Sequence, residues 1–132
     1  MHRLFLDANV LFSAAYRERS GLLALWKLKD VQLCSSHYAV EEARVNLSDD
    51  IQREQLVTLT KAMELFDGSP RPLPRGTSLP EKDVPILLGA IEAEATHLIT
   101  GDLKHFRMYF GKKIAGILVI PPADYLKTYA AT

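Results

Sequence analysis

Two short apolar runs that each lead to an aspartate constrain the fold of this chain more than any other feature. Leu4-Phe5-Leu6 is followed by Asp7, and Leu98-Ile99 is followed by Thr100-Gly101-Asp102. In an open α/β sheet, ligands bind outside the carboxyl ends of the strands, so acids that follow two buried parallel strands can converge in one crevice. Two carboxylates held close together repel each other unless a proton or a cation lies between them. A hard divalent metal ion fits that place.

Strand and helix patterns alternate along the rest of the chain. The spacing of apolar residues, together with Gly, Pro and capping signals, predicts strands over 2–6, 31–35, 97–100 and 114–120. It predicts helices over 8–16, 21–29, 37–47, 49–66, 84–95 and 124–129, with a loop over the Pro- and Gly-rich segment 68–80. This βαβ alternation indicates a parallel sheet with helices on both faces.

The composition limits the class of protein only modestly. A chain of 132 residues suits one domain, so we expect residues 1–132 to form a single domain. Lys+Arg and Asp+Glu are equal at 16 each, so the net charge gives no sign of a nucleic-acid partner, which must be sought in local charge. The single cysteine, Cys34, excludes an internal disulfide and suits a reducing compartment. No apolar run of about 20 residues is present, so we expect a cytoplasmic protein with no membrane insertion.

Three of the acids also have an alternative interpretation. Asp7 could cap the helix that follows its strand. Asp83 precedes Val84-Pro85, a common helix start, so capping is again the alternative. Asp102, after Thr100-Gly101, could be an ordinary turn residue. All three nevertheless fall on the strand-end or helix-start side of the predicted sheet, which independent caps need not do, and this favours a shared site.

A fourth acid is expected on the helix over 37–47, where Glu41 and Glu42 are adjacent. At about 100° per residue, Glu41 points away from the buried stripe of this helix and toward Arg44, three residues on, as one partner of a solvated ion pair. Glu42 lies nearer the edge of the stripe, one turn before Asn46, where a carboxylate can face a cleft. Helical geometry therefore favours Glu42, with Glu41 as the alternative.

Four segments in this order carry a family resemblance: Leu6-Asp7-Ala8-Asn9-Val10-Leu11, Val40-Glu41-Glu42-Ala43-Arg44, Asp83-Val84-Pro85-Ile86-Leu87-Leu88-Gly89-Ala90, and Leu98-Ile99-Thr100-Gly101-Asp102 with Phe106 after it. The ordered set resembles the motifs of PIN-domain proteins and spans almost the whole chain. The stand-alone size resembles that of the VapC-like toxins of bacterial and archaeal toxin–antitoxin pairs. One departure is Leu103-Lys104-His105, where many relatives have a further acid.

The resemblance implies a three-layer α/β/α sandwich with a central, mostly parallel sheet. It implies a metal-dependent endoribonuclease, the toxin of a toxin–antitoxin pair, with a homodimeric state and an antitoxin partner. Cleavage of RNA would leave a 5′-phosphate and a 3′-hydroxyl. Acid-only ligands, without a Cys or His cluster, suit Mg²⁺ or Mn²⁺ rather than zinc. The resemblance implies that Asn9 and Thr100 are polar supports in the site. It also implies that one or two such ions are held by four catalytic ligands, Asp7, Glu42, Asp83 and Asp102.

Local charge indicates where RNA would bind. No acid occurs between Asp102 and Asp124, whereas this segment contains the aromatic residues Phe106, Tyr109 and Phe110. Cations among stackable rings suit single-stranded RNA, although a solvated surface with Phe106 in the core is the alternative. The four histidines show no paired spacing, and we assign none of them a catalytic role. The candidate RNA-binding cations are Lys104, Arg107, Lys112 and Lys113.

Other functions are compatible with the same residues. Within the resemblance, the chain could be an RNA-processing PIN nuclease without an antitoxin, or a catalytically idle scaffold that binds RNA or protein. Intact acids argue against the idle scaffold, because a repulsive carboxylate cluster has little use in a binding-only domain. A receiver-like or phosphatase-like domain would use Asp7 as a phosphorylated nucleophile. The phosphatase interpretation needs an aspartate two residues later, where this chain has Asn9.

Overall fold

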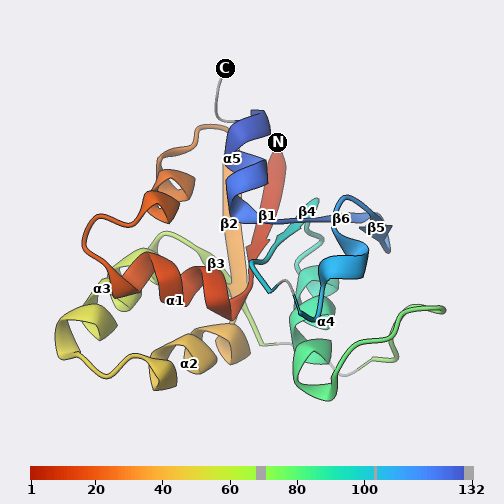
Figure 1. Cartoon of the computed structure of the whole chain (residues 1–132), viewed down its shortest axis with the longest axis horizontal. Helices are drawn as coiled ribbons and strands as arrows, with labels where there is room; N and C mark the ends of the chain where they lie inside the picture. Colours follow the sequence, from red (N-terminus) through yellow and green to blue (C-terminus); the bar gives the residue numbers. More distant parts are fainter. Residues whose placement is uncertain (68–70, 103, 130–132) are drawn as a thin grey trace.

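A six-stranded sheet forms the centre of the molecule (Figure 1). The computed structural model describes residues 1–67, 71–102 and 104–129. The strand order is β3-β2-β1-β4-β6-β5, and every neighbouring pair is parallel except β5 with β6. The strands are β1 (His2–Leu6), β2 (Val31–Ser36), β3 (Glu64–Phe66), β4 (His97–Ile99), β5 (Lys113–Ile114) and β6 (Ile117–Ile120).

Five α-helices and three 3₁₀ helices flank this sheet in the described part of the chain. The α-helices are α1 (Ala8–Tyr16), α2 (His37–Asn46), α3 (Asp50–Lys61), α4 (Val84–Glu92) and α5 (Pro122–Tyr129). The 3₁₀ helices are η1 (Gly21–Lys27), η2 (Glu81–Asp83) and η3 (Arg107–Tyr109). Helix α1 packs against α2 and α3, whereas α4 packs against β2 and β4. The result is the expected α/β/α sandwich with a mostly parallel sheet.

The central strand β1 is buried on both faces, and its burial holds the layers together. Leu4, Phe5 and Leu6 are all fully buried. The ring of Phe5 points to α4, because a Cβ placed on Gly89 would lie 2.8 Å from Phe5 Cζ. Leu4 and Leu6 point to the opposite face, since successive side chains of a strand alternate. Glycine at position 89 therefore permits the close approach of α4, which begins next to the carboxyl ends of the strands.

The predicted helix over 49–66 is wrong at its carboxyl end. Helix α3 ends at Lys61, and Glu64–Phe66 form the edge strand β3, in which Leu65 pairs with Ser35 of β2. The apolar spacing continues from the helix into the strand, so periodicity alone does not separate the two elements. Pairing with β2, distant in sequence, decides the conformation of this segment.

The single strand predicted over 114–120 is also wrong, because the segment is a hairpin. Strands β5 and β6 are antiparallel, and Ile114 pairs with Ile117 across a two-residue turn. Both turn residues have positive φ, 52° at Ala115 and 82° at Gly116, as the tightest hairpin turns require. Alanine rarely adopts this conformation, which is why the sequence does not signal the turn.

The remaining differences are small. The predicted helix over 21–29 is the 3₁₀ helix η1, which ends at Lys27. Helix α2 is capped by Ser36, whose Oγ accepts a hydrogen bond from the Ala39 amide at 3.1 Å. In the predicted loop over 68–80, residues 71–80 contain no helix or strand, and 68–70 lie outside the described residues. Among the described residues, no helix is long and apolar enough to cross a membrane.

Candidate functional site

Asp7 lies at the carboxyl end of β1, where its backbone amide donates to Ile99 of β4 at 3.0 Å. Asp7 is almost fully buried, with 4% of the residue exposed. One carboxylate oxygen, Oδ1, accepts a hydrogen bond from the Ala8 amide at 2.6 Å and so caps α1. The other oxygen, Oδ2, accepts from the Thr100 hydroxyl at 2.8 Å. The capping interpretation is therefore correct for one oxygen, while the second is held by a side chain from the neighbouring strand end.

Asn9 and Thr100 tie the two strand ends together. The Asn9 side-chain amide donates to Asp7 Oδ2 at 3.2 Å and to Thr100 Oγ1 at 3.3 Å. Its carbonyl oxygen accepts from the Gly101 amide at 2.8 Å. The Thr100 hydroxyl also accepts from the Asp102 amide at 3.1 Å. These bonds fix the turn that carries Asp102 relative to Asp7, so both residues act as polar supports between the two acids.

Asp83 ends η2 and directly precedes α4, but its side chain makes no capping hydrogen bond. The capping interpretation is therefore wrong for this residue. The carboxylate is buried, with 6% of the residue exposed, and Oδ2 lies 2.6 Å from His105 Nδ1. A buried acid that does not serve the helix is available for another partner.

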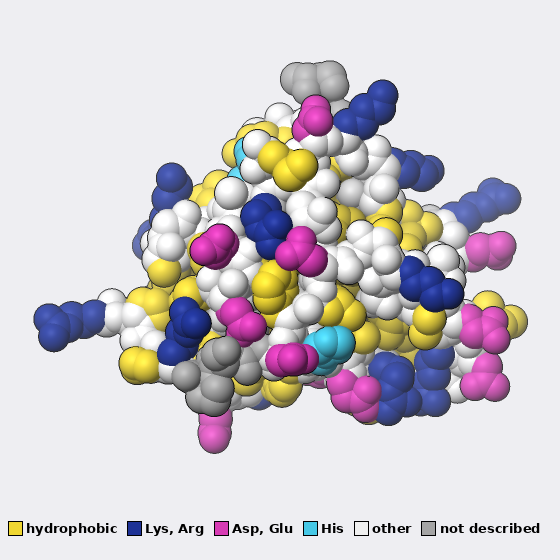
Figure 2. Space-filling model, turned by 180° about the vertical axis from the view of Figure 1, so that it is seen from behind, with side chains coloured by type: hydrophobic (Ala, Val, Ile, Leu, Met, Phe, Trp, Pro, Cys, Tyr) yellow, Lys and Arg dark blue, Asp and Glu magenta, His cyan; other side chains and the backbone are white. Residues whose placement is uncertain are grey.

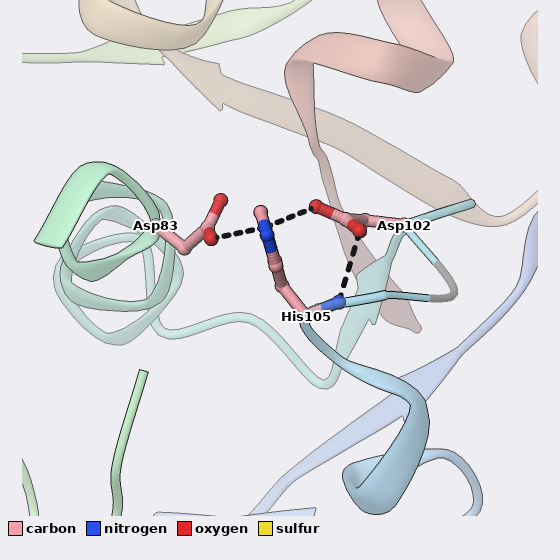
Figure 3. Close-up of side chains that lie close together, drawn as sticks. All are labelled: Asp83, Asp102 and His105. Atoms are coloured by element: carbon pink, nitrogen blue, oxygen red, sulfur yellow. Dashed lines mark hydrogen bonds and ion pairs between the residues drawn. The ribbon is translucent and has the colours of Figure 1, made fainter. Parts of the chain in front are cut away.

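Asp102 and His105 form a tight turn after β4 (Figure 3). Asp102 Oδ1 accepts from the backbone amides of Lys104 at 3.2 Å and His105 at 3.0 Å. Asp102 Oδ2 lies 2.9 Å from His105 Nδ1. The turn interpretation is thus correct for one oxygen of Asp102, and the other points at the imidazole. His105 Nδ1 consequently lies between the carboxylates of Asp83 and Asp102 (Figure 3).

Two atoms of this cluster have no hydrogen-bond partner in the described part of the chain. Asp83 Oδ2 and His105 Nδ1 are both inaccessible to solvent, and their close approach does not meet hydrogen-bond geometry. A buried polar atom without a hydrogen bond costs about 1–3 kcal/mol, and the ion-pair contacts of His105 Nδ1 with Asp83 and Asp102 offset this cost in part. Ligand atoms of Asp83, Asp102 and His105 all lie within 4.8 Å of one another, which is close enough to share one metal ion. The donor set, with two carboxylates and one imidazole, therefore fits a divalent cation.

Glu42 and Glu41 differ as helical geometry predicts. Glu41 forms an ion pair with Arg44, with Oε1 2.6 Å from Nη2, and both side chains are largely exposed. Glu42 instead lines the cleft that contains the three aspartates. Burial raises the pKa of the Glu42 carboxyl, Lys82 lowers it, and Asp83 and Asp102 raise it further. Glu42 is therefore the glutamate that is electrostatically coupled to the cluster.

The cleft has a volume of about 620 Å³. All four predicted acids line it, together with Asn9, whereas Thr100 is fully buried beneath. Acidic side chains gather near the centre of the face shown in Figure 2, with Lys and Arg side chains among them and toward its margin. The acids come from the end of β1, from α2, from the start of α4 and from the turn after β4.

Burial and mutual repulsion make this cleft unfavourable for negative charge. Loss of hydration raises the pKa of Asp7 to about 6, and the charges of Asp83 and Glu42 add to the rise. The hydrogen bonds from Thr100 and Ala8 oppose it. Burial also raises the pKa of Asp83, an effect that the nearby His105 opposes. A divalent cation would relieve this strain by neutralising the carboxylates.

The predicted RNA-binding cations do not all lie in one place. Lys104 lines the acidic cleft and also a neighbouring cavity of about 510 Å³, which Arg107 and Lys112 line as well. Lys113 pairs with Leu118 in β5–β6, and Leu118 pairs with His97 at the start of β4. Lys113 is thus at the strand end opposite Asp102. The ring of Phe106 is fully buried in the core.

Sequence reasoning missed two residues of this site. His105 had no paired histidine to mark it, although its place three residues after Asp102 is where a turn can bring a side chain back to the carboxylate. Lys82 lines the cleft beside Glu42, and its position next to Asp83 was the only available signal.

Comparison with known proteins gives a match at the level of the fold. No family model matches the sequence, and no curated protein matches it. The chain is similar to one chain in the crystal structure of VapBC2 from Rickettsia felis, a complex bound to a DNA fragment from its promoter. The TM-score is 0.66 at 16% identity, and the match covers 90% of this chain and 98% of that chain. The chain has a PIN-like fold. The expectation drawn from the ordered sequence motifs is therefore confirmed for the fold.

Two further structures support the PIN-like fold. A chain of VapBC-1 from nontypeable Haemophilus influenzae gives a TM-score of 0.60 at 14% identity, covering 92% of this chain and 98% of that chain. A chain of FitAcB from Neisseria gonorrhoeae gives 0.52 at 20% identity, covering 91% and 98%. Because each neighbour is matched over nearly its full length, the PIN-like fold accounts for almost the whole of this chain.

Proposed function

We propose that the chain acts as one PIN-like nuclease domain, a divalent-metal-dependent endoribonuclease that hydrolyses RNA phosphodiester bonds. The observation that carries the proposal is the convergence of four carboxylates, from four separate elements, in one cleft at the carboxyl ends of β1 and β4. Repulsion among these carboxylates destabilises the protein unless a cation is bound. A cluster with only a structural role would have no reason to retain four acids that repel one another. Asp7, Glu42, Asp83 and Asp102 would hold Mg²⁺ or Mn²⁺.

Each residue of the cleft has a defined part in this proposal. A metal ion in this site would lower the pKa of a coordinated water and would neutralise charge that develops on the scissile phosphate. Asn9 and Thr100 hold Asp7 and the Asp102 turn in fixed relation through their hydrogen bonds. Lys104, at the rim of the same cleft, would attract the RNA phosphates. Hydrolysis at the bond between phosphorus and the 3′ oxygen would leave a 5′-phosphate and a 3′-hydroxyl.

We further propose that the enzyme is the toxin of a toxin–antitoxin pair, acts in the cytoplasm and forms a homodimer. Support for the toxin role and an antitoxin partner comes from the fold neighbours, which are chains of VapBC and FitAB structures. An antitoxin segment that placed an Arg or Lys among the carboxylates would compete with the metal. Expression of the chain without a partner should arrest growth, and Asp102→Asn should relieve the arrest. Harmless high-level expression would argue against the toxin role and leave the nuclease role open.

Cleavage of single-stranded RNA by the purified chain tests the nuclease proposal. We expect cleavage with Mn²⁺ or Mg²⁺, none with a chelator, and loss of cleavage in Asp102→Asn. Asp67→Asn is the matched control, because the Asp67 side chain is 93% exposed and pairs with His37. End-labelling of the products should show 5′-phosphates. Full activity of Asp102→Asn would exclude this cleft as the active site.

A further inference from the structure

We propose that His105 is a metal ligand through Nδ1, beside Asp83 and Asp102, and that it makes the cleft prefer Mn²⁺ to Mg²⁺. This inference rests on the proposed metal-dependent function and specifies the ligand set of that site. From the sequence alone, only acids are expected as ligands. The position of one imidazole nitrogen in the structure changes this expectation.

The backbone holds His105 in place for this role. Its amide donates to Asp102 Oδ1 at 3.0 Å, so the turn after β4 fixes the ring relative to the carboxylate. Nδ1 lies 2.6 Å from Asp83 Oδ2 and 2.9 Å from Asp102 Oδ2. In an octahedral site with bonds of about 2.1 Å, neighbouring ligand atoms lie about 3 Å apart. The distance from Nδ1 to each carboxylate oxygen is close to that value, and the three ligand atoms all lie within 4.8 Å of one another (Figure 3).

Two buried atoms that lack a hydrogen bond among the described residues, Asp83 Oδ2 and His105 Nδ1, are an independent reason to expect a ligand here. Asp83 is 6% exposed, and its Oδ2 faces the cluster without a hydrogen-bond partner among the described residues. His105 Nδ1 lacks such a partner too. The contact between the two residues is an ion pair without hydrogen-bond geometry, and charge-assisted hydrogen bonds are strong only when aligned, so a metal ion could replace this contact at small cost. A cation between the carboxylates and the imidazole would satisfy both atoms.

One nitrogen ligand alters which ion the cleft prefers. Mg²⁺ loses its water reluctantly and favours oxygen ligands, whereas imidazole suits transition metals. The four carboxylates keep the site hard, and carboxylate-rich sites suit Mn²⁺. Adding a single imidazole to such a set should therefore favour Mn²⁺ over Mg²⁺, while the acids retain appreciable affinity for both ions.

Pulsed electron paramagnetic resonance of the Mn²⁺-loaded protein tests the inference without measuring activity. We expect a hyperfine coupling between Mn²⁺ and a ¹⁴N nucleus in the native chain. In protein whose histidines alone are labelled with ¹⁵N, this coupling should be replaced by the ¹⁵N pattern, which identifies the nitrogen as that of a histidine. This readout needs no substitution and so does not depend on the folding of a variant. Native protein that binds Mn²⁺ without a nitrogen coupling would overturn the inference.

Substitution of His105 provides a second measurement. It distinguishes a histidine that binds the metal from a histidine that occupies the place of the metal as a cation. By calorimetry, His105→Asn should weaken Mn²⁺ binding by about tenfold or more and Mg²⁺ binding by less than about threefold. His37→Asn is the matched control, because this exposed histidine pairs with Asp67 outside the cleft. If His105 were only a cation that occupies the place of the metal, His105→Asn would leave Mn²⁺ binding unchanged or tighten it, and this result would refute the inference.

The inference and the proposed function can fail separately. If His105→Asn leaves Mn²⁺ binding unchanged while Asp102→Asn abolishes both metal binding and RNA cleavage, His105 is not a ligand and the nuclease proposal stands. If the native chain binds neither Mn²⁺ nor Mg²⁺, the inference and the proposed function are both refuted.

Discussion

Buried ionisable groups lie at both the amino and the carboxyl ends of strands β1 and β4, but only those at the amino ends all have hydrogen-bond partners among the described residues. At the amino ends, the rings of His2 and His97 lie with their centroids 4.4 Å apart and tilted by 45°, next to the rings of Tyr125 and Tyr129. Each histidine has a partner: His2 Nδ1 lies 2.8 Å from the Tyr125 hydroxyl, and His97 Nδ1 lies 2.7 Å from the Thr96 hydroxyl. This end is an aromatic cluster in which His97 and Tyr125 are buried and Tyr129 is exposed.

The carboxyl ends of the same strands present an open cleft lined by four acids, with two buried atoms that have no hydrogen-bond partner among the described residues. A polar group that is satisfied within the protein contributes to stability and specificity of packing, whereas one left unsatisfied lowers stability. The comparison indicates that the amino ends serve the fold and the carboxyl ends serve a ligand.

The largest expected difference is in catalysis. Asp7→Asn should lower the rate of metal-dependent RNA cleavage by at least about 100-fold, because a ligand of the ion is removed. His97→Gln, at the other end of the sheet, should leave the rate within about twofold. Single-turnover cleavage at saturating Mn²⁺ measures both. A comparable loss in the two variants would mean that the two ends are not functionally distinct.

Asp7 should also make the metal-free protein less stable at neutral pH. Its pKa is raised to about 6 from a usual value near 3.8, so between these values the folded state holds a proton that the unfolded state has lost. Stability from this group is present below about pH 4 and is lost as the pH rises to 6. The loss is about 3 kcal/mol at pH 7.

Urea unfolding with a chelator measures this effect. Asp7→Asn should raise the free energy of unfolding at pH 7 by about 2 kcal/mol, since part of the gain is lost with the hydrogen bonds that the carboxylate accepts. At pH 4 it should give no gain. Asp67→Asn, an exposed carboxylate, should have little effect at either pH. An equal effect of Asp7→Asn at both pH values would show that charge burial is not the cause.

His97 should act in the opposite direction. Burial lowers its pKa to about 4 from 6.5, with His2 and Lys113 adding to the shift. Between these values the unfolded state binds a proton that the folded state does not, so stability is lost as the pH falls from about 6.5 to 4.

His97→Gln should remove this acid sensitivity. The free energy of unfolding of the variant should fall by about 1–2 kcal/mol less than that of the native chain between pH 6.5 and 4, because solvent at the end of the sheet screens part of the full shift. Chelator-treated protein followed by circular dichroism in urea measures the difference. An identical pH dependence in the two proteins would exclude His97 as its source.

Much of the site could be predicted because parallel strands bring their carboxyl ends to one edge. Asp7 and Asp102 follow buried apolar runs, and the helical angle separates Glu42 from Glu41. The position of Lys113 could not be predicted in the same way. The β5–β6 hairpin depends on a positive φ at Ala115, which the sequence does not signal, and this turn places Lys113 beside Leu118 rather than near the cleft.

His105 and β3 escaped prediction for a related reason, because both depend on contacts between segments distant in sequence. The imidazole is identified by its distance from Asp83, which begins a helix in another part of the chain. Strand β3 exists because Glu64–Phe66 pairs with β2. Local patterns contain no information on either contact.

The smallest expected effect concerns RNA affinity. Lys112 lines the cavity next to the acidic cleft, whereas Lys113 lies toward the amino ends of the strands. Lys112→Ala should weaken single-stranded RNA binding for all sequences and reduce the slope of log affinity against log salt by roughly 0.7. The adjacent Lys113→Ala is the matched control and should leave the slope unchanged. If Lys112→Ala also keeps the slope of the native chain, this segment does not contact the RNA.

Titration of Mn²⁺ into the metal-free protein, monitored by calorimetry, tests the central claim that the carboxyl ends of the strands form a metal site. Two adjacent glutamates provide the sharpest contrast, because Glu42 lines the cleft and Glu41 pairs with Arg44 at the surface. We predict that the native chain binds Mn²⁺, that Glu42→Gln weakens binding by about tenfold, and that Glu41→Gln leaves it unchanged. Absence of binding in the native chain, or a loss of binding in Glu41→Gln alone, would contradict the account.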